Sequence, residues 1–459
     1  MAMEEEIEIL EPYELFYSDL ISLSSIDNVL ESSSSSSSSP SNDGEIERLE
    51  AISRAIMEAL GPTGPGLLAI TDVPNAAHLR RTLLPLARDL AILSNDDRKR
   101  ILKDHGLGSD VPLKNLDRSV SSFAMQLKYG DNLNSSNLSC ERPDCLAKPC
   151  EREEKSTACA NKKLMDSHFK DLGGSFRELG FCMMDLGLRL ARICDRAIGG
   201  KELEESLLES GTAKGRLVHY HSTLDTCIIK ESGRRNGSKK AQPNSKPERL
   251  HAMNGNNSNK GEKVQKNDEY GRSYEECSDL WQQWHYDYGT FTVLAGPMFI
   301  RPKCDQTKNL EGNCVKFCGA ESPSPSGHTY LQILHPHKNS ICIVKAPPES
   351  FILQVGESAD ILSKRKLQST LHSVLRPINM GDLSRETFVT FLHPAWNKVF
   401  DITDYPMEQY EKKSQTAQDG IHKIIPPLSS RLKGGMTFAE FSRETTRQYY
   451  GGNGLQSNR

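Results

Sequence analysis

The chain has 459 residues, of which 36% are hydrophobic and 26% charged, and its mean hydropathy is -0.55. These values are typical of a globular protein with extensive polar loops, in one large domain or two smaller ones. The formal net charge of -4 and the pI near 6.4 exclude a general electrostatic attraction to nucleic acids or anionic membranes. The acidic start, MAMEEEIEIL, is unlike a secretory signal, and the longest apolar run, 291–300, is too short to cross a bilayer. We therefore expect a cytoplasmic protein, with a nuclear location also open and no membrane partner.

In a reducing compartment the twelve cysteines are expected to be free thiols. Two groups lie close together in the sequence: Cys140, Cys145, Cys150 and Cys159, and then Cys304, Cys314 and Cys318. Neither group has the close pairs that structural zinc sites use. We expect no structural metal in either group.

The N-terminal third predicts helices and one strand. Residues 1–130 are expected to form a helical and strand region that packs on the core, with helices over 45–60 and 79–93 and a strand over 67–73. The serine run 33–39 predicts a flexible loop. A polar, cysteine-containing loop over 131–163 precedes a segment, 164–214, that contains a scaffold helix. Apolar residues at a spacing of three to four continue from 164 to 198, and Gly199-Gly200 ends this helix.

After Gly215 the pattern changes to short strands. They are predicted over 216–221, 285–294, 330–334, 341–345, 351–355, 371–375 and 387–392. Such strands, separated by glycine and proline, are typical of a sandwich, jelly roll or barrel. We therefore place a β-core over 215–400 in an α+β fold, with inserts at 231–270 and 301–327 that look like surface loops. The C-terminal segment, 401–459, ends in a helix over 437–450.

A His-x-Asp pair lies in the segment 284–290, WHYDYGT. On a strand, His285 and Asp287 would point to the same face because side chains alternate. One imidazole and one carboxylate on a face can occupy two corners of an octahedral metal site. Alone the motif is weak, because a chain with thirteen histidines gives about one such tripeptide by chance. The alternative is a strand histidine hydrogen-bonded to its neighbour.

Downstream residues favour the metal interpretation. His372 supplies a third ligand from another segment, and two histidines with one carboxylate are the ligand set of non-haem iron(II) oxygenases. Arg385 and Thr387 share a strand face beyond it. A guanidinium and a hydroxyl near a metal suit the far carboxylate of a dicarboxylate. The alternative for Arg385 is a surface salt bridge.

These motifs, in this order, resemble the 2-oxoglutarate- and iron(II)-dependent oxygenases similar to isopenicillin N synthase, known from plants and microbes, and we expect a plant member. The family pattern is His-x-Asp-x-Gly-Thr, then Gly-Asp…Ser-Asn-Gly…Ser-x-x-His, then Arg-x-Ser. This chain has His285-Tyr286-Asp287-Tyr288-Gly289-Thr290, then Gly356-Glu357…Leu362-Ser363-Lys364…Ser369-Thr370-Leu371-His372, then Arg385-Glu386-Thr387. Glu357 and Thr387 depart from the pattern, but every iron ligand is present.

The resemblance implies a double-stranded β-helix, or jelly roll, flanked by helices. It also implies that His285, Asp287 and His372 are catalytic iron ligands and that Arg385 and Thr387 bind 2-oxoglutarate. Tyr220 aligns with the tyrosine of the family's Asn-x-Tyr motif, although Val218 replaces the asparagine. The expected reaction oxidises a small organic substrate by hydroxylation, desaturation or demethylation, with dioxygen as co-substrate and ascorbate as a candidate reductant. We expect a monomer.

Three alternatives remain open at this stage. His219 and His221, with Asp225, form a rival metal cluster, although Val218 and Tyr220 share parity with Arg216, which the resemblance places near the pocket. The two histidines are therefore expected to face outward or to pack against a helix. A protein of this fold could also have lost turnover and act as a ligand-binding or interaction module. The basic insert 231–270 could bind nucleic acid, but its interleaved acids and lack of stacking aromatics favour a solvated loop.

Overall fold

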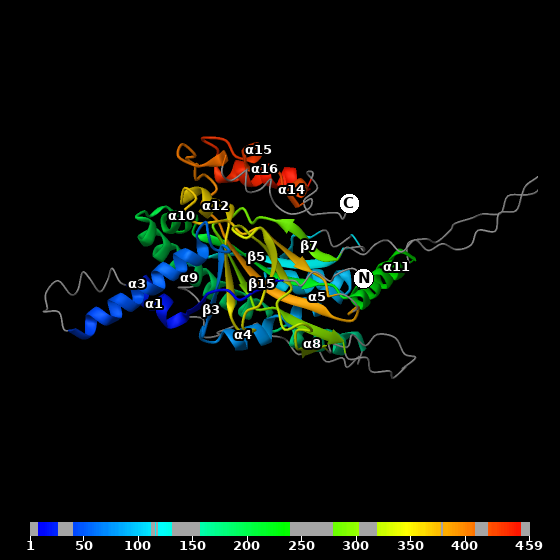
Figure 1. Cartoon of the computed structure of the whole chain (residues 1–459). Coiled ribbons are helices and arrows are strands. Elements are labelled where there is room, and N and C mark those ends of the chain that lie inside the picture. Colours follow the sequence, from blue (N-terminus) through cyan, green and yellow to red (C-terminus); the bar gives the residue numbers. More distant parts are fainter. Residues whose placement is uncertain are drawn as a thin grey trace, which may run out of the picture.

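The computed structural model describes residues 8–25, 40–111, 115, 118–130, 157–238, 279–302, 319–377, 380–408 and 421–450. Strands and helices are mixed, and two β-sheets face one another (Figure 1), which confirms the α+β class. The strands are β1 (Glu8–Leu10), β2 (Glu14–Phe16), β3 (Leu67–Thr71), β4 (Gly108–Ser109), β5 (Val120–Lys128), β6 (Thr212–Tyr220), β7 (Leu280–His285), β8 (Phe291–Ala295), β9 (Met298–Pro302), β10 (Gly319–Ser322), β11 (Leu331–His335), β12 (Ser340–Val344), β13 (Phe351–Val355), β14 (His372–Leu375) and β15 (Ser384–Leu392). The helices are α1 (Tyr17–Ser24), α3 (Pro40–Leu60), α4 (Ala76–Leu83), α5 (Pro85–Ile92), α6 (Asn95–Asp104), α8 (Thr157–His168), α9 (Leu172–Ile198), α10 (Glu202–Ser210), α11 (Thr223–Ser238), α12 (Glu357–Leu362), α14 (Ile421–Ile424), α15 (Leu428–Arg431) and α16 (Phe438–Tyr450).

The strand order is that of a double-stranded β-helix. The smaller sheet runs β1-β12-β11-β14-β7, and the larger runs β2-β3-β13-β8-β15-β6-β5-β4, with β9 and β10 added beside β15. After β6 the chain passes back and forth between the sheets: β7, β11, β12 and β14 belong to the smaller one, and β8, β13 and β15 to the larger one. This alternation, with antiparallel neighbours throughout the core, confirms the predicted jelly roll.

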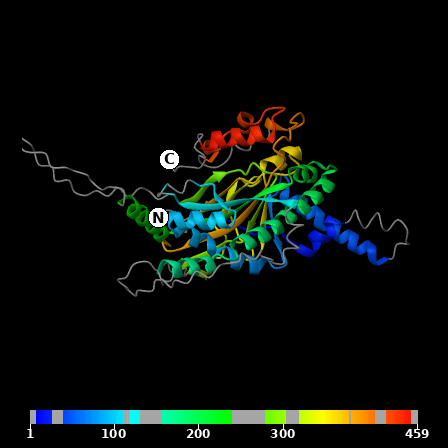
Figure 2. The ribbon, with the colours of Figure 1, turned by 180° about the vertical axis from the view of Figure 1, so that it is seen from behind.

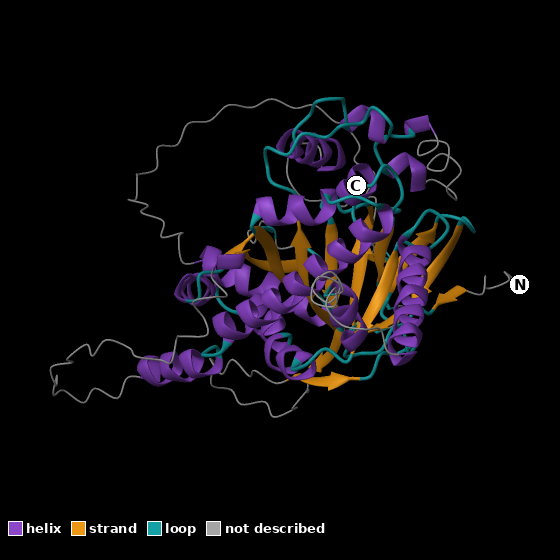
Figure 3. Ribbon diagram, turned by 90° about the vertical axis from the view of Figure 1, so that its left-hand side faces the viewer, coloured by secondary structure: helices purple, strands orange, loops and turns teal. Residues whose placement is uncertain are grey.

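The larger sheet is buried on both faces. Its outer face packs on the scaffold helix α9, where the rings of Phe176 and Phe388 meet edge to face with centroids 4.7 Å apart. Figures 2 and 3 show the helices that cover this face. Its inner face packs on the smaller sheet, where Val218 and Val389 belong to the same apolar cluster as Trp281. Burial on both sides accounts for the nearly continuous apolar sequences of β3 and β13.

Several elements differ from the sequence-based prediction in their limits. The helix expected over 79–93 is divided into α4 and α5 at Pro85, which lacks the N–H that a continuous helix needs. The segment 164–198 is divided into the end of α8 and α9, with a break over 169–171. The strand expected over 285–294 is two strands, β7 and β8, with a turn at 286–290. The serine run, Cys140, Cys145, Cys150 and the second cysteine group lie outside the described residues.

The two inserts are shorter than predicted. Residues 231–238 continue α11, which starts with a capping box in which Ser222 Oγ accepts from the Asp225 N–H and donates to its carboxylate. Residues 319–322 form β10, which pairs with β9. The rest of the first insert, from 239, and residues 303–318 of the second lie outside the described residues. The remaining domain limits stay predictions.

A C-terminal layer covers one end of the barrel. Helices α15 and α16 lie beside α12 (Figure 1), and Phe400, Phe438 and Phe441 form an apolar cluster with Ile361 of α12. Tyr286 and Tyr288, in the turn after β7, pack against this cluster. The layer therefore supports the turn that contains Asp287. Among the described helices, none combines the length and the apolar character needed to cross a membrane.

Candidate metal centre

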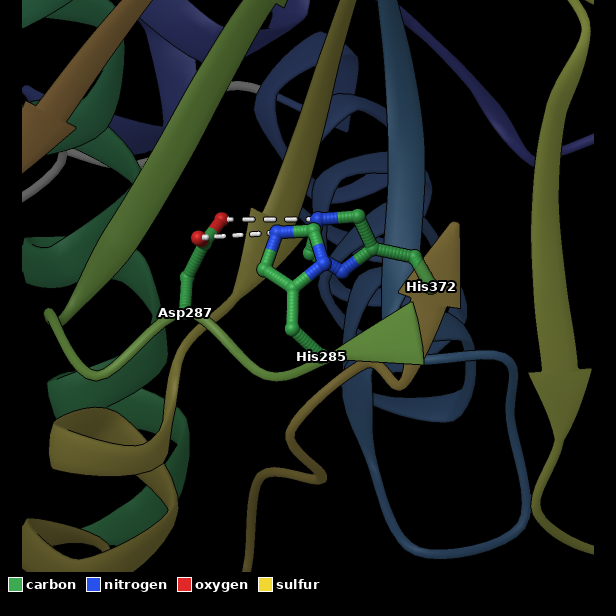
Figure 4. A group of neighbouring side chains, drawn as sticks. All are labelled: His285, Asp287 and His372. Carbon is green, nitrogen blue, oxygen red and sulfur yellow. Dashed lines mark ion pairs between the residues drawn. The ribbon is translucent and has the colours of Figure 1, made fainter. Parts of the chain in front are cut away.

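Two histidines and one aspartate meet between the sheets. His285 ends β7, His372 begins β14, and the two residues are direct partners across this strand pair. Their ring centroids lie 4.2 Å apart, and Nε2 of each ring lies 3.8 Å from a carboxylate oxygen of Asp287 (Figure 4). One donor atom from each residue lies within 4.8 Å of the others, and within the described part of the chain this is the group of donors that could hold a metal ion.

The turn after β7 orients Asp287, and the expectation of a continuous strand through this residue is wrong. The strand ends at His285, and the Asp287 carbonyl accepts a 2.8 Å hydrogen bond from the N–H of Glu357 at the start of α12. Gly289 and Gly356 pack so closely that a Cβ on Gly356 would overlap the Gly289 carbonyl. The carboxylate therefore owes its position to the contact between this turn and α12, and not to the alternation of a strand.

Hydrogen bonds fix both imidazoles in the tautomer that a metal requires. Nδ1 of His285 lies 2.8 Å from the carbonyl oxygen of Gln283, and Nδ1 of His372 lies 3.0 Å from that of Thr370. A carbonyl only accepts, so each Nδ1 carries a proton, and each Nε2 lies on the side of its ring that faces Asp287. The Thr292 hydroxyl donates to the Asp287 carboxylate at 2.6 Å. Such outer hydrogen bonds orient metal ligands.

Burial sets the charge state of the centre. Burial, together with the neighbouring His372, lowers the pKa of His285 to about 4. Burial raises the pKa of Asp287, but His372, His285 and the hydrogen bond from Thr292 outweigh it, so this pKa lies below its usual value. The donors are therefore a neutral imidazole and a carboxylate at neutral pH, and protonation of His285 is displaced to more acid conditions than for an exposed histidine.

Arg385 lies on the inner face of β15, where it is the partner of Tyr220 on β6. It is 3% exposed, its Nε donates to the Thr329 carbonyl at 3.1 Å, and its guanidinium lies 5.2 Å from the ring centroid of Tyr220. No carboxylate of the described residues forms an ion pair with it. A buried cation without an internal anion is costly, which favours an anionic ligand here.

The other two residues predicted to bind the cosubstrate have hydroxyls that are already engaged. Thr387 is buried, and its hydroxyl donates to the Ala295 carbonyl at 3.0 Å. The Tyr220 hydroxyl donates to Oε1 of Gln282 at 2.6 Å. Each hydroxyl would have to turn away from its present acceptor before it could donate to a ligand.

Gln282 is a site residue that the sequence did not reveal. Its amide Nε2 lies 2.9 Å from Nε2 of His285, so it donates to the nitrogen that would bind a metal. It therefore links Tyr220 to His285. Its position three residues before His285 was visible in the sequence, but a β-bulge between β14 and β7 shifts the register here, and periodicity alone does not reveal a bulge.

The rival histidines lie on the opposite face of β6, as parity predicted. His219 and His221 are buried, and Nδ1 of His219 lies 2.9 Å from both carboxylate oxygens of Glu386. Its Nε2 lies 3.6 Å from Asp225, which forms a 2.8 Å ion pair with Arg88 of α5. This arrangement joins α5, α11, β6 and β15 through buried charges and is a structural network behind Arg385.

Acid conditions are expected to destabilise the protein partly through His221. Burial, with repulsion from His219 and Arg118, holds its pKa well below 6.5. Below about pH 6.5 the unfolded chain takes up a proton on His221 and the folded chain does not. The free energy of unfolding therefore has its full value above that pH and decreases as the pH falls, by at most about 1.4 kcal/mol per pH unit. Urea unfolding between about pH 7 and pH 5 measures this slope.

In His221→Gln the new amide can still hydrogen-bond Ser121, whose hydroxyl lies 2.9 Å from Nε2 of the native ring. The free energy of unfolding of this variant should depend less steeply on pH than that of the wild type. His337→Gln, at an exposed position, is the control and should keep the wild-type slope. A steep slope that survives His221→Gln would contradict the assignment.

The chain is similar to solved structures at low sequence identity. No protein-family model and no curated protein matches the chain. Among solved structures, it is similar to a full-length Neurospora crassa protein in complex with alpha-KG and 5-formyluracil (TM-score 0.44, 13% identity, 97% of each chain covered). It is also similar to dioxygenase for auxin oxidation 1 of Arabidopsis thaliana in its 2-oxoglutarate complex (TM-score 0.39, 14% identity, 76% of this chain and 90% of that one). The dioxygenase for auxin oxidation of rice gives TM-score 0.39 at 13% identity, covering 82% of this chain and 94% of that one. The fold assignment rests on the strand order of this chain, and these distant likenesses carry nothing about its site.

Proposed function

We propose that the protein is an iron(II)- and 2-oxoglutarate-dependent oxygenase that acts on a small organic molecule. One observation carries the proposal: a donor group of two imidazoles and one carboxylate lies between the same two sheets as a buried guanidinium that no described carboxylate neutralises. The donor set is that of non-haem iron(II) oxygenases, which leave coordination positions open for other ligands. A lone buried guanidinium suits the distal carboxylate of a dicarboxylate.

In this proposal His285, Asp287 and His372 hold the iron, and Arg385 binds 2-oxoglutarate. Iron, together with 2-oxoglutarate and dioxygen, supplies the oxidising chemistry, in which 2-oxoglutarate is converted to succinate and carbon dioxide. The chain orients the reactants and excludes water. Val218, Val389 and Trp281 line the space between the sheets with apolar surface. Tyr220 and Thr387 are secondary cosubstrate contacts, and ascorbate is the candidate reductant.

The test is succinate formation by the purified full-length protein with Fe(II), 2-oxoglutarate and dioxygen, with omission of each component in turn. Pools of small metabolites are added in parallel to supply a substrate. Thermal stability with Fe(II) and 2-oxoglutarate measures binding independently of turnover. A protein that binds both but forms no succinate with any pool would be a ligand-binding module, and one that binds neither would refute the proposal.

Arg385→Gln is expected to weaken 2-oxoglutarate binding on the order of 100-fold, because charge-assisted hydrogen bonds to a carboxylate contribute roughly 1.5–3 kcal/mol. The KM for 2-oxoglutarate and the melting temperature with and without it measure the effect. Without ligand the variant should be no less stable than the wild type, because it removes a buried cation that lacks an internal carboxylate.

Arg301→Gln is the matched control, since Arg301 forms an exposed pair with Asp382 and should leave the KM unchanged. A wild-type KM in Arg385→Gln would remove Arg385 from the cosubstrate site.

A further inference from the structure

Two further cations lie along the inner face of β6. Alternate residues of a strand share a face, so Lys214 and Arg216 lie on the same side as Tyr220. In the β6–β15 register, Arg216 is opposite Val389 and Lys214 is opposite Phe391, both beyond the Tyr220–Arg385 pair. The inner face therefore contains one buried cation at the proposed cosubstrate anchor and two more cations further along the same strand pair.

The charge of these two cations is only half neutralised. The carboxylate of Asp110 lies 3.0 Å from Nζ of Lys214 and 2.6 Å from Nε of Arg216. Among the described residues, Asp110 is the one carboxylate that forms an ion pair with Lys214 or Arg216. Two cations and one anion leave a net charge of +1. The Arg216 side chain is 33% exposed, so a dissolved ligand can reach it.

Arg216 is close to the metal donors. Thr292 of β8 donates a hydrogen bond to Asp287 and is opposite Phe391 of β15. Strand β15 lies between β8 and β6, so Phe391 lies between Thr292 and Lys214. Two strand spacings, on the order of 10 Å, therefore separate Thr292 from Lys214, and Arg216 is the next residue after Lys214 on the same face of β6. The Arg216 guanidinium lies 4.7 Å from the Phe391 ring centroid, so the flat apolar ring of Phe391 lies between Arg216 and the residues on β8.

We propose that the substrate of this site is a small organic acid, whose carboxylate binds Arg216 and whose apolar body lies on Phe391 and Val389. This inference rests on the proposed oxygenase function. A guanidinium binds a carboxylate through two parallel hydrogen bonds, and its present partner Asp110 reaches it through Nε. The oxidised carbon is then a few bonds from the acid group, because the interval between Arg216 and the metal donors is short.

The experiment measures binding of matched acids and amides to the full-length protein with Mn(II) in place of Fe(II) and saturating 2-oxoglutarate, so that no turnover occurs. The probes are phenylacetate, 3-phenylpropanoate and hexanoate, each against its primary amide, by calorimetry. At least one acid should bind about 10- to 100-fold more tightly than its amide. Arg216→Gln should abolish this preference without weakening 2-oxoglutarate, and Arg216→Lys should keep part of it.

Arg301→Gln, at the exposed pair with Asp382, is the matched control and should keep the full preference. No preference for any acid, or a preference that survives Arg216→Gln, would overturn the inference. If Mn(II) and 2-oxoglutarate bind and no acid is preferred, the inference alone fails. If neither Mn(II) nor 2-oxoglutarate binds, the oxygenase proposal fails and the inference fails with it.

Discussion

Replacing His372 with alanine is expected to abolish iron-dependent succinate formation and to weaken Fe(II) binding by on the order of 100-fold or more. The substitution removes one of three donor atoms that lie within 4.8 Å of one another. Loss of a residue that only orients a ligand already costs roughly 10- to 100-fold, so loss of the ligand itself should cost at least as much. Metal content after dialysis against limiting Fe(II), and succinate release, give two independent measurements.

His337→Ala is the control for His372→Ala, because His337 is exposed in the turn after β11. It should keep wild-type iron content and turnover. His372→Ala protein that is folded, retains iron and releases succinate at the wild-type rate would refute the metal centre as assigned.

Arg431→Met is expected to destabilise the protein by about 3–5 kcal/mol, because it leaves a buried carboxylate without its cation. Arg431 and Glu357 form a two-bond ion pair, at 2.8 Å and 2.6 Å, with side chains 0% and 1% exposed. The pair joins the C-terminal layer to the first residue of α12, whose N–H holds the Asp287 carbonyl. We therefore expect weaker iron binding together with the loss of stability. Urea unfolding and iron titration measure the two effects.

The double variant Arg431→Met/Glu357→Met should recover most of the stability, because an apolar pair can replace a buried ion pair. Arg447→Met is the matched control in the same layer: Arg447 pairs with Glu444 at the surface, is 64% exposed, and should change stability by less than about 1 kcal/mol. Equal stability of Arg431→Met and Arg447→Met would show that the buried pair does not hold the layer.

The sequence predicted the β-core well because its strands are buried on both faces. β13 coincides with its expected range, and β11, β12 and β14 begin or end within one residue of theirs. The short N-terminal strands and β5 were missed. β1 pairs with β12 and β2 with β3, so long-range pairing stabilises them more than their own patterns do.

The candidate site was only partly predictable from sequence. The order of the motifs predicted that His285, Asp287 and His372 form one site, and in the structure their donor atoms lie close together. The way Asp287 is held was predicted wrongly, because a strand end cannot be read from alternation over three residues. The contact of Asp110 with Arg216 was not predicted, because spacing within one segment says nothing about which distant loop packs against it. The roles of Arg385, Thr387 and Tyr220 stay predictions.

The amide of Gln282 has a consequence for the order in which the centre fills. Its amide N–H donates to the lone pair on Nε2 of His285, and its amide oxygen accepts from the Tyr220 hydroxyl. A cation on His285 needs that same lone pair, so the amide has to swing aside before or as the cation arrives. The movement frees the phenol beside Arg385. If a cation and a dicarboxylate bind as proposed, release of the Gln282 amide from His285 would also release the Tyr220 hydroxyl, so the cation would bind before Tyr220 could donate to the dicarboxylate.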